Sequence, residues 1–418
     1  MKQNTFFITP RLLTVLLLTI FSFACKKNSN ITTKTIKLYT PVYSSKATAL
    51  ASINGSQSQA VTKAGKIYIK DNYIFLNDLN KGIHIIDNTN PSHPVQIAFL
   101  AIPGNLDIAV KGNILYADMY GDLLALDITN PRNVSIVSKV ENFFMGRMWV
   151  NGFNTQSGDK IVADWIERDT VVEINYQRYP PLCDFCKVDI LYANAAGVNS
   201  TGTAGSMASM VLMDDHLYAI TEMHSLGIVD ITNPAAPKVD TSFFAGFDLQ
   251  TVFPFKGKLF LGSSIGMFMY DVTDPQHPLA AGKFEHGRAC DPVIADDKYA
   301  YVTLHSGDGC GGDANELHVI DINDLANSKL VKTYQLTKPT GLSKDGNLLF
   351  VCDETAVKIY NATNPSALSL IKTINSNQPY DVITFNKKMM IVCNDGLYQY
   401  DYSDINNVRR LSFIAARK

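Results

Sequence analysis

One short phrase recurs along the chain and constrains its fold more than any other feature. It is an apolar run that ends in Asp-x-Thr-Asn-Pro, and its first copy closes with Asp87-Asn88-Thr89-Asn90-Pro91. The Asp side chain can accept hydrogen bonds from backbone N–H groups two residues on, and proline cannot continue a central strand. Each copy therefore predicts a buried strand followed by a turn. The later and looser copies are centred on Asp127, Asp230, Asp271, Asp321, Asn361 and Asp401.

The spacing of the copies indicates the architecture. Most lie about forty to fifty residues apart, which is typical of propeller blades with several β segments per unit. The interval between Asp127 and Asp230 is much longer, and we assign a degenerate copy to it. There Asp164 precedes Glu173 by the same nine residues that separate Asp78 from Asp87. The sequence thus predicts an all-β fold, an eight-bladed β-propeller of four-stranded blades, with seven blades as the alternative.

The start of the chain has the pattern of an export signal. Residues 12–24 form an uncharged, mostly apolar run after Lys2 and Arg11, too short to span a membrane as a mature helix. Small residues before Cys25 resemble a bacterial lipoprotein signal, in which Cys25 becomes lipidated. A plain secretory signal with a free Cys25 is the alternative. We expect a signal peptide over 1–24, a lipid-anchored tether over 25–62 and the propeller over 63–418, held at the outer membrane on its surface or periplasmic side.

The charge balance excludes one class of partner. Removal of the signal would lower the Lys and Arg total from 37 to 35 against 39 acidic residues, which leaves a mildly acidic surface. No stripe of basic residues is available to neutralise a phosphate backbone, so we expect no nucleic-acid binding.

Two units carry insertions, at about 175–206 and 305–316. Long loops in compact domains are usually functional or disordered, and rigid blades position variable loops for binding. The insertions are therefore the expected contact elements for a protein or glycan. The second is rich in glycine and acidic residues, and Asp308, Asp313 and Glu316 offer hard oxygen ligands for calcium. They lack the ligand spacing of a dedicated calcium loop, so we favour a solvated loop over a calcium site.

Six cysteines follow Cys25, and an exported chain meets an oxidising compartment. We predict a Cys290–Cys310 disulfide that closes the second insertion. For Cys183 and Cys186, a local disulfide or a redox-active pair is favoured over a metal site, because no matching ligand pair exists. Two further cysteines, Cys352 and Cys393, occupy equivalent strand positions. We interpret them as small buried apolar groups, although their shared phase would permit a bridge.

Three aspartates offer the best candidate site. Asp107, Asp291 and Asp381 each open the first strand of a blade, so in a propeller they would ring the mouth of the central channel. There they could hold a metal or a cationic ligand. The alternative is that they cap backbone amides at the strand starts. No G-x-S-x-G, H-E-x-x-H or P-loop pattern is present, and no catalytic residue is assigned.

Several segments resemble the repeats of LVIVD-repeat proteins, a group of predicted bacterial surface propellers. The resemblance is carried by residues 82–87 (GIHIID), 110–118 (VKGNILYAD), 290–293 (CDPV) and 301–307 (YVTLHSG). It implies an exported propeller lipoprotein and supplies no reaction. We therefore expect a monomeric, non-enzymatic module that binds a protein or glycan. The alternative is a metal-dependent hydrolase or lactonase that uses Asp107, Asp291 and Asp381.

Overall fold

The computed structural model describes residues 31–55, 58–175, 203–290, 292–306 and 312–417. They divide into two compact units. The described part of the smaller unit, 31–39 and 167–175, contains portions of β1 (Ile31–Ser45) and β13 (Lys160–Asn175). Within it Lys37 Nζ lies 3.1 Å from a carboxylate oxygen of Glu167 and 3.4 Å from one of Asp169.

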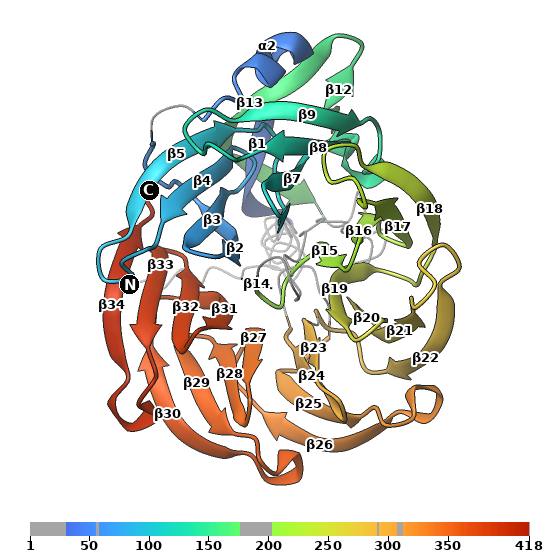
Figure 1. Cartoon of the computed structure of the whole chain (residues 1–418), viewed down its shortest axis with the longest axis vertical. Helices are drawn as coiled ribbons and strands as arrows, with labels where there is room; N and C mark the ends of the chain where they lie inside the picture. The colour runs from blue at the N-terminus through green and yellow to red at the C-terminus, as the bar shows by residue number, and fades with distance from the viewer. Residues whose placement is uncertain (1–30, 56–57, 176–202, 291, 307–311, 418) are drawn as a thin grey trace, which may run out of the picture. The chain divides into compact units, whose positions relative to one another are not determined.

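The larger unit is built mainly from four-stranded antiparallel sheets that follow one another around a common centre (Figure 1). We number these sheets 1 to 7 in chain order. Sheet 1 contains β2 (Ala64–Lys70), β3 (Tyr73–Asp78), β4 (Gly82–Asp87) and β5 (Val95–Ala101), with β14 (Thr203–Ala204) added beside β2; sheet 2 contains β6 (Ile108–Lys111), β7 (Ile114–Met119), β8 (Asp122–Asp127) and β9 (Ser135–Val140); sheet 3 contains β15 (Met210–Met213), β16 (His216–Glu222), β17 (Ser225–Asp230) and β18 (Lys238–Phe244).

The remaining sheets repeat this order. Sheet 4 contains β19 (Leu249–Phe255), β20 (Lys258–Ser263), β21 (Gly266–Asp271) and β22 (Leu279–Glu285); sheet 5 contains β23 (Val293–Ala295), β24 (Tyr299–Leu304), β25 (Glu316–Asp321) and β26 (Lys329–Gln335); sheet 6 contains β27 (Pro339–Asp345), β28 (Leu348–Asp353), β29 (Ala356–Asn361) and β30 (Ser369–Asn375); sheet 7 contains β31 (Pro379–Phe385), β32 (Lys388–Cys393), β33 (Gly396–Asp401) and β34 (Arg409–Ala415). Short 3-10 helices lie at Met145–Arg147 (η1), Leu325–Asn327 (η3), Pro365–Ala367 (η4) and Ile405–Asn407 (η5).

The recurring phrase has the predicted role in all seven of its copies. Each ends the third strand of a sheet and begins the turn to the fourth. In the first copy the Thr89 N–H donates to Asp87 Oδ1 at 2.9 Å, and the same bond to the residue two positions earlier recurs in the other six. The prediction of a buried strand followed by an Asp-capped turn is confirmed.

The eighth unit expected between Asp127 and Asp230 does not form a sheet of this kind in the described residues. Residues 160–175 instead make one 16-residue strand, β13, in a three-stranded sheet with β1 and β12 (Gln156–Ser157). Ile166 and Val171 are 55% and 65% exposed, whereas a strand between two stacked sheets would bury such side chains. The described residues therefore form six four-stranded sheets and one five-stranded sheet around the ring, and no eighth sheet of this kind.

The segment expected to be a tether, 25–62, contains ordered elements where it is described. Helix α2 (Lys46–Ala51) begins at Ser45, whose hydroxyl accepts the Thr48 N–H at 3.0 Å. Its Ala49 is buried in a hydrophobic cluster shared with sheet 2, and Lys46 Nζ lies 2.6 Å from Asp122. Residues 40–55 thus belong to the larger, packed unit, because the short capped helix buries its apolar side in the cluster shared with sheet 2.

The first strands of successive sheets contact one another in order around the centre: β2, β6, β15, β19, β23, β27 and β31. The ring closes between its two ends, where Val61 forms a parallel bridge with Ala416, and the Tyr380 hydroxyl donates to the Ala64 carbonyl at 2.7 Å. This closed arrangement is a β-propeller.

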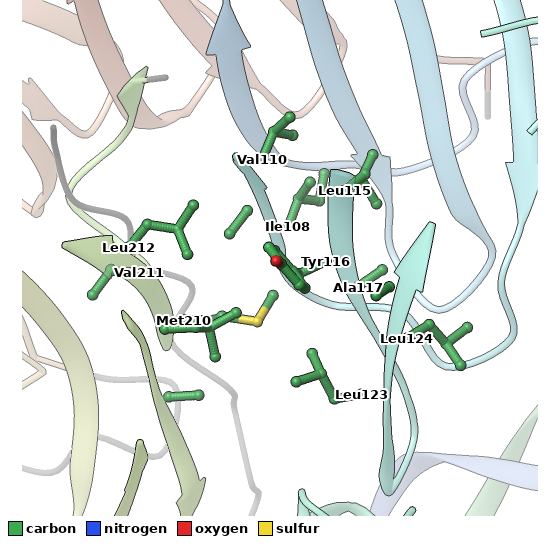
Figure 2. Packing of buried hydrophobic residues seen from close by; sticks show 14 of the residues in the cluster. Ile108, Val110, Leu115, Tyr116, Ala117, Leu123, Leu124, Met210, Val211 and Leu212 are labelled. Atoms are coloured by element: carbon green, nitrogen blue, oxygen red, sulfur yellow. The ribbon is translucent and has the colours of Figure 1, made fainter. Parts of the chain in front are cut away.

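Apolar side chains fill the space between neighbouring sheets. Figure 2 shows Met210 of β15 beside Tyr116 of β7, both of them buried. Both faces of the inner strands are apolar because each sheet is covered by the next, as the sequence predicted. Two short strands outside the seven sheets, β10 (Trp149–Val150) and β11 (Phe153–Asn154), form a hairpin. Among the described residues, no helix is long and apolar enough to cross a membrane.

Candidate functional site

Two of the three predicted site aspartates lie at the centre of the ring, and Asp291 lies outside the described residues. Asp107 directly precedes β6, and Asp381 is near the start of β31; both are buried. Each accepts the N–H of the next residue, Ile108 at 2.8 Å and Val382 at 2.9 Å. These are the hydrogen bonds from backbone amides at the strand starts that the capping interpretation predicts.

The other oxygen of Asp107 belongs to a buried ion pair. Asp107 Oδ2 lies 2.5 Å from Lys66 Nζ of β2 and also accepts the Ser209 N–H at 2.8 Å and the Ser209 hydroxyl at 2.9 Å. Burial raises the pKa of Asp107 and lowers the pKa of Lys66, and the attraction between the two groups opposes both shifts. Because the Ser209 hydroxyl donates to a carboxylate, it is held as a structural donor.

Asp381 is bonded to the same stretch of chain. Its Oδ1 accepts the Ser206 N–H at 3.2 Å and the Ser206 hydroxyl at 3.4 Å, and that hydroxyl accepts the Leu342 N–H at 2.8 Å. A Cβ on Gly205 would stand 1.9 Å from Asp381 Oδ2, so only glycine fits there. Burial raises the pKa of Asp381 to about 7. Residues 205–209, which span the end of the first insertion, are thus bonded to Asp381 through Ser206 and to Asp107 through Ser209.

A third aspartate, Asp118, completes the polar cluster at this end of the ring. It is the penultimate residue of β7, and its Oδ1 accepts the N–H groups of Leu106 and Asp107 at 2.9 and 2.8 Å. Its Oδ2 lies 2.5 Å from Arg147 Nη1, and a second nitrogen of Arg147 donates to the Gly104 carbonyl at 2.5 Å. We call Lys66, Asp107, Asp118, Arg147 and Asp381 the central cluster.

The sequence carries a signal for Asp118 in the spacing of aspartates before the recurring phrase. Asp78 and Asp118 stand nine residues before the Asp of the phrase, and Asp353 stands eight before Asn361, at the same strand end. Asp78 accepts the N–H groups of Thr62 and Lys63 at 2.7 and 2.9 Å; Asp353 accepts those of Thr337 and Lys338 at 2.9 and 2.8 Å. The recurring aspartate therefore anchors the connection that enters its own sheet.

The geometry of the central cluster favours stability over chemistry. Both oxygens of Asp107 and of Asp118, and Oδ1 of Asp381, are bonded to amides, hydroxyls or cationic side chains of the same chain. Among the described residues, no three His, Cys, Asp or Glu side chains are grouped to hold a metal ion. For the suggested calcium set, Asp308 is outside the described residues, and the Glu316 carboxylate is bonded to His318 at 2.7 Å and Gln335 at 2.8 Å.

The described cysteines are buried. Cys352 and Cys393 carry free thiols in a shared apolar cluster of sheets 6 and 7, and burial raises the pKa of both, to about 12 for Cys393. This agrees with their interpretation as small apolar groups. Cys25, Cys183, Cys186 and Cys310 lie outside the described residues. The lipidation, the local pair and the Cys290–Cys310 disulfide stay predictions.

An aromatic surface lies at the end of the sheets where the central aspartates are found. Phe244 and Phe247 are 58% and 55% exposed, and their rings meet edge to face at 5.0 Å between centroids. The His224 ring lies 5.4 Å from that of Phe247. Met223 precedes His224 in the turn after β16, and Met145 extends the surface, since Gly146 packs on Thr221 and Glu222. We call Met145, Met223, His224, Phe244 and Phe247 the aromatic patch.

Comparison with known proteins supports the fold. The model of the LVIVD repeat family matches residues 62–98, 105–142, 204–243 and 286–336, which include most of sheets 1, 2, 3 and 5. Among curated proteins, none matches the chain. The crystal structure of Sqt1 from Saccharomyces cerevisiae is similar over 88% of this chain and 89% of its own, with 10% identity and a TM-score of 0.51. A protein from Lactobacillus plantarum is similar over 84% of this chain and 96% of its own, with 10% identity and a TM-score of 0.53.

At such low identity these two structures support the fold alone. The family match agrees with the repeat pattern read from residues 82–87 and 110–118, both of which fall inside matched segments. The chain carries LVIVD repeats, four of them matched by the family model, on a β-propeller fold.

Proposed function

We propose that this protein is an exported, lipid-anchored propeller that binds a protein partner through the aromatic patch. The observation that carries the proposal is the exposure of Phe244 and Phe247 side by side on a rigid sheet end. Exposed contiguous apolar patches are uncommon on proteins that stay unpartnered. Aromatic residues, methionine and arginine are the side chains enriched in protein interfaces, and rigid aromatic rings dominate their binding energy.

Charged groups border the patch as a polar rim would. Asp248 follows Phe247, and its carboxylate lies 3.3 Å from Arg288 Nη2 and accepts the Ser264 hydroxyl at 2.8 Å. The Asp248 N–H donates to His224 Nδ1 at 3.2 Å, which ties the rim to the patch. An apolar centre with a polar margin is the usual anatomy of a protein interface.

The second insertion borders the same surface. A Cβ on Gly312 would stand 1.7 Å from the Arg288 carbonyl oxygen, so the described end of the 305–316 insertion lies directly against Arg288. The sequence singled out this insertion as a contact element, and its position beside the patch supports that role. The central cluster, whose carboxylates are bonded within the chain, offers no comparable argument for the hydrolase alternative.

The patch is tested by replacing both phenylalanines with serine. We expect Phe244→Ser/Phe247→Ser to reduce the amount of a captured partner at least tenfold, because two aromatic anchors of about 2 kcal/mol each would be lost. The measurement is quantitative affinity capture from an envelope extract of the source cells, followed by direct titration of the captured protein.

The matched control is Leu279→Ser, which removes an exposed side chain (67%) at the other end of sheet 4. It should retain the partner, and all variants should melt like the wild type. Equal capture by the phenylalanine variant and the control would contradict the proposal. If the protein captures no protein but binds a glycan array through the patch, the partner is a glycan and not a protein.

The anchor is tested at the predicted lipidation site. In cells, Cys25→Ser should move the protein from the membrane fraction to the soluble fraction and abolish incorporation of a labelled fatty acid, since an acyl chain supplies most of the membrane affinity. Cys352→Ser, at a buried thiol, is the control and should stay membrane-bound. A Cys25→Ser protein that still sediments with membranes would refute the anchor.

A further inference from the structure

The hairpin of β10 and β11, which belongs to the larger unit, exposes an aromatic ring on each of its two faces. In its register Phe153 lies opposite Val150, which directly follows Trp149. Residues opposite each other share a face and neighbours along a strand do not, so the two rings point to opposite sides. Trp149 is 62% exposed and Phe153 is 38% exposed. The hairpin thus keeps apolar area in contact with water on both sides.

The base of the hairpin is fixed to the rest of the larger unit. The buried Thr155 donates its N–H to the Met148 carbonyl at 2.9 Å and its hydroxyl to the Arg147 carbonyl at 2.9 Å. The side chain of Gln156, the next residue, donates to the Met119 carbonyl of β7 at 2.9 Å. The exposed rings therefore stand on a support that is hydrogen-bonded to sheet 2.

The hairpin carries no charge. From residue 148 to residue 158 every side chain is apolar or neutral and polar. Charged side chains are costly to place in a bilayer, whereas tryptophan and tyrosine are enriched at the level of the lipid headgroups. The outer edges of a two-stranded sheet leave backbone groups unpaired, and these exclude it from the hydrocarbon core. The headgroup layer, where water remains, is therefore the depth that suits this hairpin.

A tyrosine connects the hairpin to the strand that follows the predicted lipidation site. The Tyr43 hydroxyl donates to the Asn154 carbonyl at 3.1 Å, and Tyr43 is itself 44% exposed. Tyr43 follows Cys25 by 18 residues, a stretch that spans at most about 65 Å when fully extended. An acyl chain on Cys25 would therefore keep the hairpin within reach of the bilayer surface.

We propose that the β10–β11 hairpin lies in the headgroup layer of the bilayer that holds the lipid anchor, with Trp149 and Phe153 as its inserted side chains. A flat protein surface or a stacked sugar ring would cover one face of the hairpin. The headgroup layer is deformable and surrounds both faces at once, as the opposite directions of the two rings require. The choice of a bilayer rests on the lipid anchor of the proposed function, and it is independent of the aromatic patch.

Tryptophan fluorescence tests this contact directly. The chain has two tryptophans, Trp149 and Trp165, and the Trp165 ring lies 6.0 Å from that of Phe153. The sample is the mature chain, residues 25–418, with Cys25→Ser to remove the acyl chain and Trp165→Phe to leave one tryptophan. With vesicles of phosphatidylethanolamine and phosphatidylglycerol, we expect the emission of Trp149 to shift to shorter wavelength. Lipids brominated near the headgroup should quench it more than lipids brominated near the chain end.

Removal of both rings should abolish most of the binding. In the chain with Cys25→Ser, we expect Trp149→Ser/Phe153→Ser to lower the vesicle partition coefficient, measured by co-sedimentation, at least about tenfold, because the two rings supply the inserted apolar area. The matched control is Leu279→Ser/Phe413→Ser, which removes side chains of similar exposure, 67% and 40%, from sheets 4 and 7. The control should bind vesicles like the starting protein, and both variants should melt at its temperature.

The proposal is overturned if the emission of Trp149 stays unchanged up to millimolar lipid, or if the hairpin variant and the control bind vesicles equally. An emission shift that follows protein concentration without lipid would overturn it in favour of a second copy of the chain. A shift caused by soluble oligosaccharides and not by vesicles would overturn it in favour of a glycan. Because the sample has no acyl chain, a failed hairpin test leaves the Cys25 anchor unaffected, and a failed anchor test leaves the hairpin result unchanged.

Discussion

Replacing Asp118 by asparagine is expected to lower the free energy of unfolding by about 3–5 kcal/mol. The carboxylate is buried, it pairs with the equally buried Arg147, and it accepts two backbone N–H groups from the connection that enters sheet 2. An asparagine keeps one oxygen for the amides but leaves the guanidinium of Arg147 without its countercharge. An unpaired charge in a buried site is far more costly than the loss of an exposed ion pair.

Urea unfolding followed by circular dichroism measures this loss. The control is Asp127→Asn, which replaces the capping aspartate in the turn after β8. The equivalent turn of sheet 6 is naturally built on Asn361, which accepts the Thr363 N–H at 2.9 Å, so this change should alter stability by less than about 0.5 kcal/mol. If both variants lose the same stability, the buried pair with Arg147 does not carry the energy assigned to it.

The stability of the wild type, measured against Asp381→Asn, is expected to fall as the pH rises from about 4 to 7. Burial raises the pKa of Asp381 to about 7 in the folded protein, against about 3.9 in an unfolded chain. Between these values the folded state binds more protons than the unfolded state, so a rise in pH favours unfolding. The difference amounts to roughly 4 kcal/mol, since each pKa unit corresponds to about 1.4 kcal/mol.

Unfolding free energies of both proteins at pH 4.5 and pH 8 provide the measurement. The asparagine variant keeps an acceptor for Val382 and Ser206 and has no proton to lose, so other titrating groups cancel in the comparison. If the unfolding free energies of the wild type and the variant change in parallel across this range, Asp381 is already ionised at low pH. The nearby ammonium group of Lys66 would then be the cause.

Much of the fold follows from contacts between residues close in the chain. The turn that ends each third strand depends on one side chain and the amide two residues later, so a single copy predicts its own structure. Repetition of that copy at a period near forty predicts stacked sheets. The degenerate copy at Asp164 failed because a nine-residue spacing carries no information about pairing, and β13 pairs with β1 from a distant part of the chain.

The site was only partly visible in the sequence. Asp107 and Asp381 could be singled out one at a time, since each opens an apolar strand. Their partners could not, because Ser209 lies 102 residues from Asp107 and Ser206 lies 175 residues from Asp381. The aromatic patch had no signal either, as its members come from a helical turn, a hairpin turn, a strand end and a connection between sheets, and share no spacing.

The amino-acid sequence by itself determined the strands, the capped turns and the repeat, because these depend on hydrogen bonds and apolar alternation within a few residues. Only the tertiary structure decided where the ring closes, which carboxylates meet a lysine or an arginine, and which apolar side chains stay exposed. Those outcomes depend on how seven similar sheets pack around one centre, and packing brings together groups that lie between 29 and 175 residues apart in the chain.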